Sequence, residues 1–219
     1  AFSVLLLFSA ALVYAGDQGT NSKSKNQQSE EVWTEPVTGI RFLKISGGTF
    51  QIGDQFSEGD LDEKPKRWIT LKSFLLGVTE VTQAQWKALM GSNPSRFKGE
   101  DRPVEKVGWH DVLHFIRKLN ILHGDAVFRL PTEAEWEYAC REGGGKVRYC
   151  NGKDEADKLG IHFLDNRTKP VASFPPNSLG LYDMSGNVWE WTCSEYKKSY
   201  DGSEAKCVVS ASRYSLRVG

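Results

Sequence analysis

The chain has 219 residues, a length that fits one domain. Hydrophobic residues make up 39% of the sequence, enough for a real core, and 21 Gly with 7 Trp indicate turns and aromatic packing rather than a helical bundle. Lys and Arg total 28, as do Asp and Glu, so the net charge is zero. Nucleic-acid binding usually requires a basic excess or stripe, which this sequence lacks, so we exclude that class of function.

The first fifteen residues, AFSVLLLFSAALVYA, are almost wholly apolar and end in Val13-Tyr14-Ala15, a small-x-small pattern that suits signal peptidase. This run is too short to span a bilayer, which takes about 20 residues. We therefore interpret residues 1–15 as a signal peptide, incomplete because the initiator Met and a basic n-region are missing, with a buried N-terminal helix as the alternative. No later stretch predicts a membrane span. An exported protein is expected: secreted, periplasmic or in the endoplasmic reticulum lumen.

Residues 16–31 are polar and without apolar periodicity, which is typical of a flexible linker. We place the linker over residues 16–34 and a single domain over residues 35–219. In an oxidising compartment, cysteines spread singly along the chain indicate disulfides or buried thiols, whereas zinc sites favour CxxC-type clusters. The sequence leaves all three pairings open for its four cysteines, Cys140, Cys150, Cys193 and Cys207.

Two segments carry strand patterns. Residues 40–52, IRFLKISGGTFQI, alternate apolar and polar side chains around Gly47-Gly48, which predicts a β-hairpin. Residues 68–78 predict a further strand, with Ile69, Leu71 and Phe74 among its apolar positions.

Three short helices carry start signals. Thr82-Gln83-Ala84-Gln85 and Thr132-Glu133-Ala134-Glu135 are capping boxes, and glycines at 91 and 143–145 mark where these two helices end. Between them, residues 109–120 place four apolar residues on one helical stripe: Val112, Leu113, Ile116 and Leu119. The predicted class is α+β, with small helices, short strands, long ordered loops and no internal repeat.

Histidines offer one candidate metal site. His110 and His114 lie four residues apart on the second helix, a spacing that can place two imidazoles on one metal. No Glu is placed as in HExxH and no third ligand is evident. His114 is flanked by Leu113 and Phe115, so the alternative interpretation is a packed side chain at this position. His123 and His162 are isolated in the sequence and indicate no site.

Acidic residues offer two further candidate sites. Glu133, Glu135 and Glu137 suit the N-terminal end of the third helix better than a catalytic carboxylate pair, because residues two apart point to different faces. Asp183 and the run at 186–191, GNVWEW, put carboxylate and amide oxygens beside two Trp rings. Hard cations such as calcium require several such oxygens on a rigid loop. A turn followed by two core tryptophans explains the same pattern, and both interpretations stay open.

Several motifs occur together over residues 35–191. The most specific are RLPTEAEWEYA at 129–139 and GLYDMSGNVWEW at 180–191, preceded by Asn177. Shorter ones are GGTF at 47–50, EVT at 80–82, NPS at 93–95, RPV at 102–104 and VGW at 107–109. In this order they resemble the formylglycine-generating enzyme, or sulfatase-modifying factor, family. The resemblance implies a variant of the C-type lectin fold, which has little regular secondary structure.

The resemblance also implies structural calcium. Asn187 matches a residue of the family's calcium loop. Glu190 matches it less closely, since it could instead be a hydrogen-bond acceptor in the core. Asn166 is a loose match to the second calcium loop of the family. We therefore expect calcium to be bound by Asn187, Glu190 and Asn166.

The family's founding activity implies a substrate and a second metal. Such an enzyme oxidises a cysteine in an unfolded sulfatase segment to formylglycine, using oxygen and copper(I) held by two cysteines near its C-terminus. This sequence stops before that segment, so we interpret it as a C-terminally incomplete copy. We expect residues 1–219 alone to be inactive, and we expect copper(I) only if the missing pair exists. Neither Cys193 nor Cys207 lies in the matching context.

Two consequences of the resemblance concern the cysteines and the alternative function. Cys193 is expected to be a structural thiol or half-cystine, and Cys140 is expected to pair with a cysteine beyond residue 219. The alternative to an oxidase is a non-catalytic, secreted, lectin-like module that binds a protein or glycan.

Overall fold

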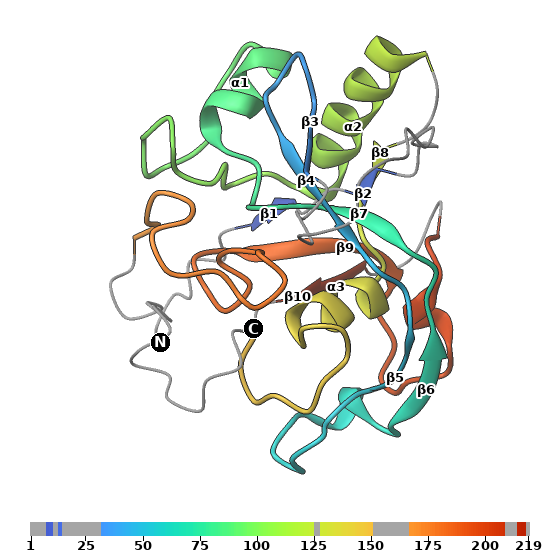
Figure 1. Ribbon diagram of the computed structural model, residues 1–219. Coiled ribbons are helices and arrows are strands. Elements are labelled where there is room, and N and C mark those ends of the chain that lie inside the picture. The colour runs from blue at the N-terminus through green and yellow to red at the C-terminus, as the bar shows by residue number, and fades with distance from the viewer. Residues whose placement is uncertain are drawn as a thin grey trace, which may run out of the picture.

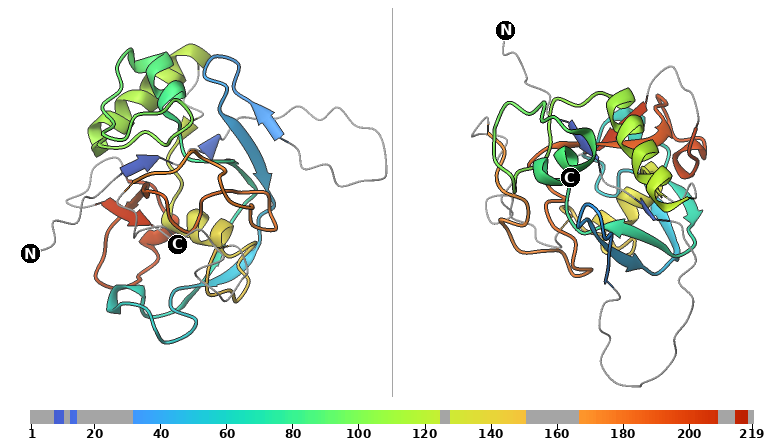
Figure 2. Two further views of the ribbon diagram at one scale, coloured as in Figure 1. Left: turned by 90° about the vertical axis from the view of Figure 1, so that its left-hand side faces the viewer. Right: turned by 90° about the horizontal axis from the view of Figure 1, so that it is seen from above.

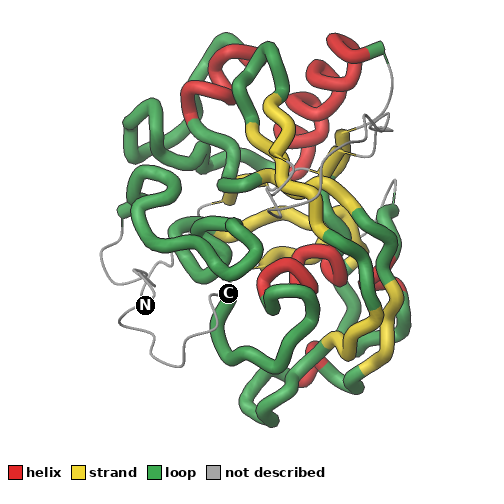
Figure 3. Tube along the Cα trace, viewed as in Figure 1, coloured by secondary structure: helices red, strands yellow, loops and turns green. Residues whose placement is uncertain are grey.

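The computed structural model describes residues 8–10, 13–14, 32–124, 128–150, 167–208 and 214–217. Its strands are β1 (Phe8–Ala10), β2 (Val13–Tyr14), β3 (Val32–Thr34), β4 (Arg41–Ile45), β5 (Thr49–Ile52), β6 (Arg67–Thr70), β7 (Phe74–Gly77), β8 (Phe128–Arg129), β9 (Trp189–Glu195) and β10 (Tyr214–Arg217). Its helices are α1 (Gln83–Met90), α2 (Trp109–His123) and α3 (Glu133–Cys140), with short 3-10 helices η1 (Leu61–Glu63) and η3 (Ser203–Ala205). Loops make up much of the rest (Figure 3), so the predicted α+β class is confirmed.

A five-stranded antiparallel sheet divides the molecule (Figure 1). Its strand order is β3-β4-β7-β2-β8. Because successive side chains of a strand point to opposite faces, Phe42 and Leu75 face a core formed with α1 and α2. Leu43 and Leu76 face the other core, which includes side chains of α3 and β5. The sheet therefore lies between two hydrophobic cores, and two further views show α1 and α2 grouped away from α3 (Figure 2).

Two smaller sheets complete the fold. β9 pairs in parallel with β1 and antiparallel with β10, and β5 pairs antiparallel with β6. The hairpin predicted over residues 40–52 is wrong, because β4 pairs with β7 while β5 pairs with β6. Gly47 allows this separation: a Cβ there would lie 2.3 Å from the carbonyl oxygen of Leu71, so only glycine lets the two backbones approach. The strand predicted over residues 68–78 is likewise divided between β6 and β7.

The predicted helix starts are confirmed. Thr82 and Thr132 each form a complete capping box, and Gly91 ends α1 in the left-handed conformation. The apolar stripe of α2 differs from the prediction at one residue, because Leu113 is exposed while Phe115 is fully buried. Leu113 lies one position from Val112, about 100° around the helix, and so points away from the core.

The N-terminal apolar segment contributes β1 and β2 to the two larger sheets. Cleavage after residue 15 stays a prediction, because residues 15–31 lie outside the described part of the chain. The predicted linker, residues 16–34, is shorter than expected at its end. Trp33 of β3 packs on Phe42 and Phe128, with ring centroids 5.5 and 6.1 Å apart, which holds residues 32–34 in the sheet. Among the described helices, none has the length and apolar character needed to cross a membrane.

Candidate functional site

The predicted calcium residues lie where the loop after residue 177 enters β9. Asn187 is in the left-handed conformation at φ 59°. Its Oδ1 accepts a hydrogen bond from the backbone N–H of Lys169 at 2.9 Å, and its Nδ2 lies 3.4 Å from the Lys169 carbonyl oxygen. The amide of Asn187 therefore joins two loops. Asn166 lies outside the described residues.

Glu190 points from β9 into the core and is 3% exposed. Its Oε2 accepts a hydrogen bond from the indole N–H of Trp136 at 2.6 Å. Burial raises the pKa of Glu190 to about 7, the Trp136 bond opposes this shift, and the charge of Asp183 adds to it. Glu190 thus has the role of a core acceptor that the sequence left open beside the metal role.

Glu80, between β7 and α1, completes a group of three carboxylates. Glu80 is 1% exposed, no donor bonds to its carboxylate oxygens in the described residues, and the group within hydrogen-bond reach of it is the carboxyl of Asp183. Burial and the charges of Asp183 and Glu190 raise the pKa of Glu80 well above its ordinary value. Asp183, at φ 56°, accepts a 2.6 Å hydrogen bond from the backbone N–H of Ala172, while burial raises its pKa. We call Glu80, Asp183 and Glu190 the carboxylate cluster.

Excess negative charge in the carboxylate cluster must be balanced by protons or by a cation. The orphaned oxygens of Glu80 suit a hard cation chemically. However, no three His, Cys, Asp or Glu side chains converge on one metal position within the described residues, and the side-chain oxygen of Asn187 is already bonded to Lys169. His110 and His114 are exposed on α2 and lie outside any such group. Calcium binding therefore stays a prediction, with Glu80 as an additional candidate ligand.

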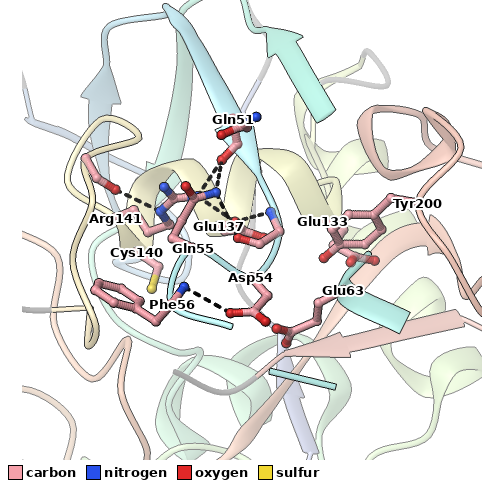
Figure 4. Close-up of polar contacts among 12 residues, drawn as sticks. Gln51, Asp54, Gln55, Phe56, Glu63, Glu133, Glu137, Cys140, Arg141 and Tyr200 are labelled. Atoms are coloured by element: carbon pink, nitrogen blue, oxygen red, sulfur yellow. Dashed lines mark hydrogen bonds and ion pairs between the residues drawn. The ribbon is translucent and has the colours of Figure 1, made fainter. Parts of the chain in front are cut away.

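A second polar cluster joins α3 to the loop after β5 (Figure 4). Glu137 accepts hydrogen bonds from the Gly53 N–H at 2.9 Å and from Arg141 at 2.8 Å, and Arg141 also donates to the Gln51 carbonyl oxygen at 2.7 Å. Asp54 accepts from the backbone N–H groups of the turn at Phe56 and Glu58, at 3.0 and 3.1 Å. These contacts hold the loop against the helix.

Next to this cluster, a small cavity of about 50 Å³ lies beside β10. Arg217 of β10 contacts Glu133 and the Tyr200 hydroxyl, and lies 3.5 Å from Glu63. Burial raises the pKa of Glu63 while the charge of Arg217 opposes that shift, and burial also raises the pKa of Tyr200. Each of these groups is held in an ion pair or hydrogen bond, so the cavity is a structural junction. The interpretation of Glu133, Glu135 and Glu137 as structural rather than catalytic agrees with these contacts.

All four cysteines are in disulfides. Cys140 pairs with Cys150, and Cys193 pairs with Cys207, which leaves no free cysteine. The expected partner of Cys140 beyond residue 219 is therefore wrong, because residue 150 returns beside the C-terminal end of α3. Cys193 was expected to be either a structural thiol or a half-cystine, and the structure shows that it is a half-cystine.

His123 has a role that its isolation in the sequence concealed. Its Nε2 lies 2.9 Å from Oε1 of Glu35, a fully buried side chain. Glu35 also accepts hydrogen bonds from the backbone N–H groups of Val37 and Thr38. The two residues are 88 positions apart, so no local pattern could predict their contact.

Comparisons with known proteins identify the family to which the chain belongs. Residues 24–217 match the family described as "Sulfatase-modifying factor enzyme 1-like domain". The chain is 32% identical to the "Chaperone protein LppX" of Paenibacillus barcinonensis over 204 residues, 69% of this chain and 70% of that protein. It is 38% identical to the formylglycine-generating enzyme of Mus musculus over 51% of this chain, but spans only 32% of that enzyme.

Two further comparisons cover more of the partner protein. The "Inactive C-alpha-formylglycine-generating enzyme 2" of Bos taurus is 29% identical over 75% of each chain. The solved structure of PvdO from Pseudomonas aeruginosa matches with a TM-score of 0.73 and 25% identity, over 88% of this chain and 87% of that one. The predicted fold is thereby confirmed, and the chain belongs to the sulfatase-modifying factor, or formylglycine-generating enzyme, family.

Proposed function

We propose that this domain is a non-catalytic binding module of its family, one that holds an extended segment of another exported polypeptide. The observation that carries the proposal is the match to LppX, described as a chaperone protein, over 69% of this chain and 70% of that protein. The state of the cysteines within residues 1–219 agrees with it. Both pairs are closed as disulfides, and the sequence contains no others. Residues 1–219 therefore offer no thiolate to a metal or to a substrate.

The alternative is the copper(I) oxidase of the founding family activity. Copper(I) favours soft thiolate ligands, and a thiol must be deprotonated before it can bind. The sulfur atoms of Cys193 and Cys207 are bonded to each other, so neither is a thiolate. The residues of this chain thus do not fit copper(I), and we derive no oxidation step from them.

The names of two relatives agree with a binding role. LppX is described as a chaperone protein, and the bovine relative is described as inactive. A chaperone and an enzyme that modifies an unfolded sulfatase segment have the same kind of partner, namely an extended polypeptide. We therefore favour an unfolded segment over a glycan as the ligand.

Export and calcium belong to the same proposal. Two disulfides are typical of proteins in oxidising compartments, which supports a secreted, periplasmic or endoplasmic reticulum location. Calcium at the carboxylate cluster would balance the charges of Glu80, Asp183 and Glu190, and so hold the loop that leads into β9. Its role would be structural.

The test uses the purified full chain with its disulfides intact. A fluorescently labelled, reduced and carboxymethylated polypeptide, which cannot fold, serves as the ligand, and the same polypeptide in its native form serves as the control. We expect fluorescence anisotropy to rise with the unfolded form alone. Equal binding of both forms, or of neither, would contradict the proposed function.

A further inference from the structure

The position of β2 in the main sheet is unusual for a segment read as a signal peptide. β2 lies between β7 and β8, and β7 and β8 do not pair with each other. Val13 is opposite Leu76 on one side and Arg129 on the other. Within the described residues, β7 and β8 are thus connected in the sheet only through the backbone hydrogen bonds of β2.

The place that β2 fills is inside the protein. Val13 is fully buried in the core that contains Leu76 and side chains of α3. Leu75 and Phe128, which lie opposite Tyr14 in the sheet, are also buried, in the other core. Strands lie about 4.8 Å apart, so β7 and β8 are separated by roughly 9.6 Å across the slot. They cannot pair directly without moving. Without a strand between them, buried N–H and C=O groups on both sides would lose their partners, a large penalty.

The same segment fills a second sheet. Three residues upstream of the slot, β1 runs parallel to β9, with Ala10 opposite Trp191. Two short strands close together in the sequence, β1 and β2, therefore each complete a different sheet (Figure 1). We call the positions of β1 and β2 the strand-acceptor site.

We infer that the strand-acceptor site binds an extended apolar segment of a client polypeptide, and that the chain's own β1 and β2 occupy it until they are displaced. This deepens the proposed function and rests on it. Strand addition supplies affinity through main-chain hydrogen bonds, and pockets for alternate side chains supply specificity. The pocket at Val13 is fully enclosed, so the client must carry an aliphatic residue at that position. Cleavage after Ala15 would turn residues 1–15 into a separable peptide that a client can replace.

The experiment starts from the full chain, folded with its N-terminal segment in place. A specific protease site is introduced within residues 16–31, and the folded protein is cut there. We expect the fragment of residues 1–15 to remain bound during size-exclusion chromatography. An excess of a fluorescent peptide with the sequence of residues 8–15, FSAALVYA, followed by a lysine tag, should then displace it and gain anisotropy.

The controls are made in the peptide, so the folding of the protein is unchanged. A peptide with Val13→Asp should bind at least tenfold more weakly, because a carboxylate cannot enter the enclosed pocket without a partner. A scrambled peptide of the same composition should not bind.

Three results would overturn the inference: loss of the fragment on cutting with no change in melting temperature, failure of the peptide to displace it, or equal binding of the Val13→Asp peptide. The carboxymethylated polypeptide separates the two proposals. If it binds the cut protein while the peptide does not, the strand-acceptor site is wrong and the binding function stands. If neither binds, both are wrong.

Discussion

At the scale of single residues, the buried acids Glu35 and Glu80 differ in the number of hydrogen-bond donors around them, and their pKa values shift in opposite directions. Glu35 has donors. Burial alone would raise its pKa, but hydrogen bonds from the Thr38 hydroxyl and from the backbone N–H groups of Thr38 and Val37, with His123, outweigh that effect and lower it. Glu80 has no donor, and its pKa is raised. The two residues therefore respond to pH and to substitution in opposite directions.

The lowered pKa of Glu35 makes a prediction about acid stability. Because the folded protein holds this carboxylate charged, its contribution is fully present above the unfolded value near 4.5 and is lost as the pH falls through the lower folded value. We expect Glu35→Gln to lower the free energy of unfolding at pH 7 by roughly 1.5–3 kcal/mol and to flatten the acid limb. Urea titrations from pH 3 to pH 7 measure both effects. An unchanged acid limb would show that Glu35 is not the group responsible.

Glu80 tests the calcium proposal. Calcium at 100 times its dissociation constant should stabilise the protein by about 2.7 kcal/mol. Glu80→Gln should reduce that gain. Without calcium at pH 8 it should raise the melting temperature, because the folded protein then neither buries this carboxylate charge nor takes up a proton at it. Glu100→Gln, a change at an exposed residue of the same type, is the matched control. A wild-type melting temperature that is the same in calcium and in chelator would exclude the site.

At the scale of elements, local signals predicted structure well and long-range pairings poorly. The capping boxes at Thr82 and Thr132 depend on residues three apart, and both are formed. β4 pairs with residues 29 to 35 positions away in β7, and β5 pairs with residues 15 to 21 positions away in β6. A local alternation of apolar and polar residues does not specify such pairings, so it could not show that the predicted hairpin at Gly47 is absent. The candidate site shows the same limit.

Motif resemblance located Asn187 and Glu190, yet the burial of Glu80 beside Asp183 and the contact of His123 with Glu35 arise only in the folded chain. Of the three expected calcium residues, the two that are described lie on one loop and strand, but their side-chain oxygens are bonded to Lys169 and Trp136. Which donor such an oxygen meets depends on tertiary packing, which residue type and spacing do not specify.

The N-terminal cap of α3 provides a prediction about an element. The Thr132 hydroxyl accepts the N–H of Glu135 at 3.1 Å, and the Glu135 carboxylate accepts the N–H of Thr132 at 2.8 Å. We expect Thr132→Ala to cost about 1 kcal/mol of stability, whereas Thr132→Ser should retain the bond and cost less. Denaturant unfolding of the three proteins measures the difference. Equal losses for both variants would attribute the effect to packing of the methyl group.

The disulfide at the C-terminal end of α3 provides a second prediction about an element. Cys140 and Cys150 enclose a short segment with a sequence separation of 10. Replacing both by Ser should lower the free energy of unfolding by roughly 2–4 kcal/mol. Peptide mapping without reduction should recover the 140–150 and 193–207 pairs. Recovery of any other pairing would contradict the arrangement of α3 and β9 described above.

At the scale of the whole molecule, the ion pairs and disulfides described above have structural roles. The main sheet separates two cores, ion pairs fasten α3 to its surroundings, and both disulfides close loops. These structural roles agree with the proposed binding function.

The most direct test of the central claim is a conversion assay on the intact chain. The protein, with its disulfides verified, is incubated with copper(I), oxygen and a cysteine-containing sulfatase peptide, and the peptide mass is followed with the reduced chain in parallel. We predict that the cysteine of the peptide stays unchanged in both reactions while the unfolded polypeptide still binds. Formation of the aldehyde by residues 1–219 would contradict the account and support the oxidase as the function.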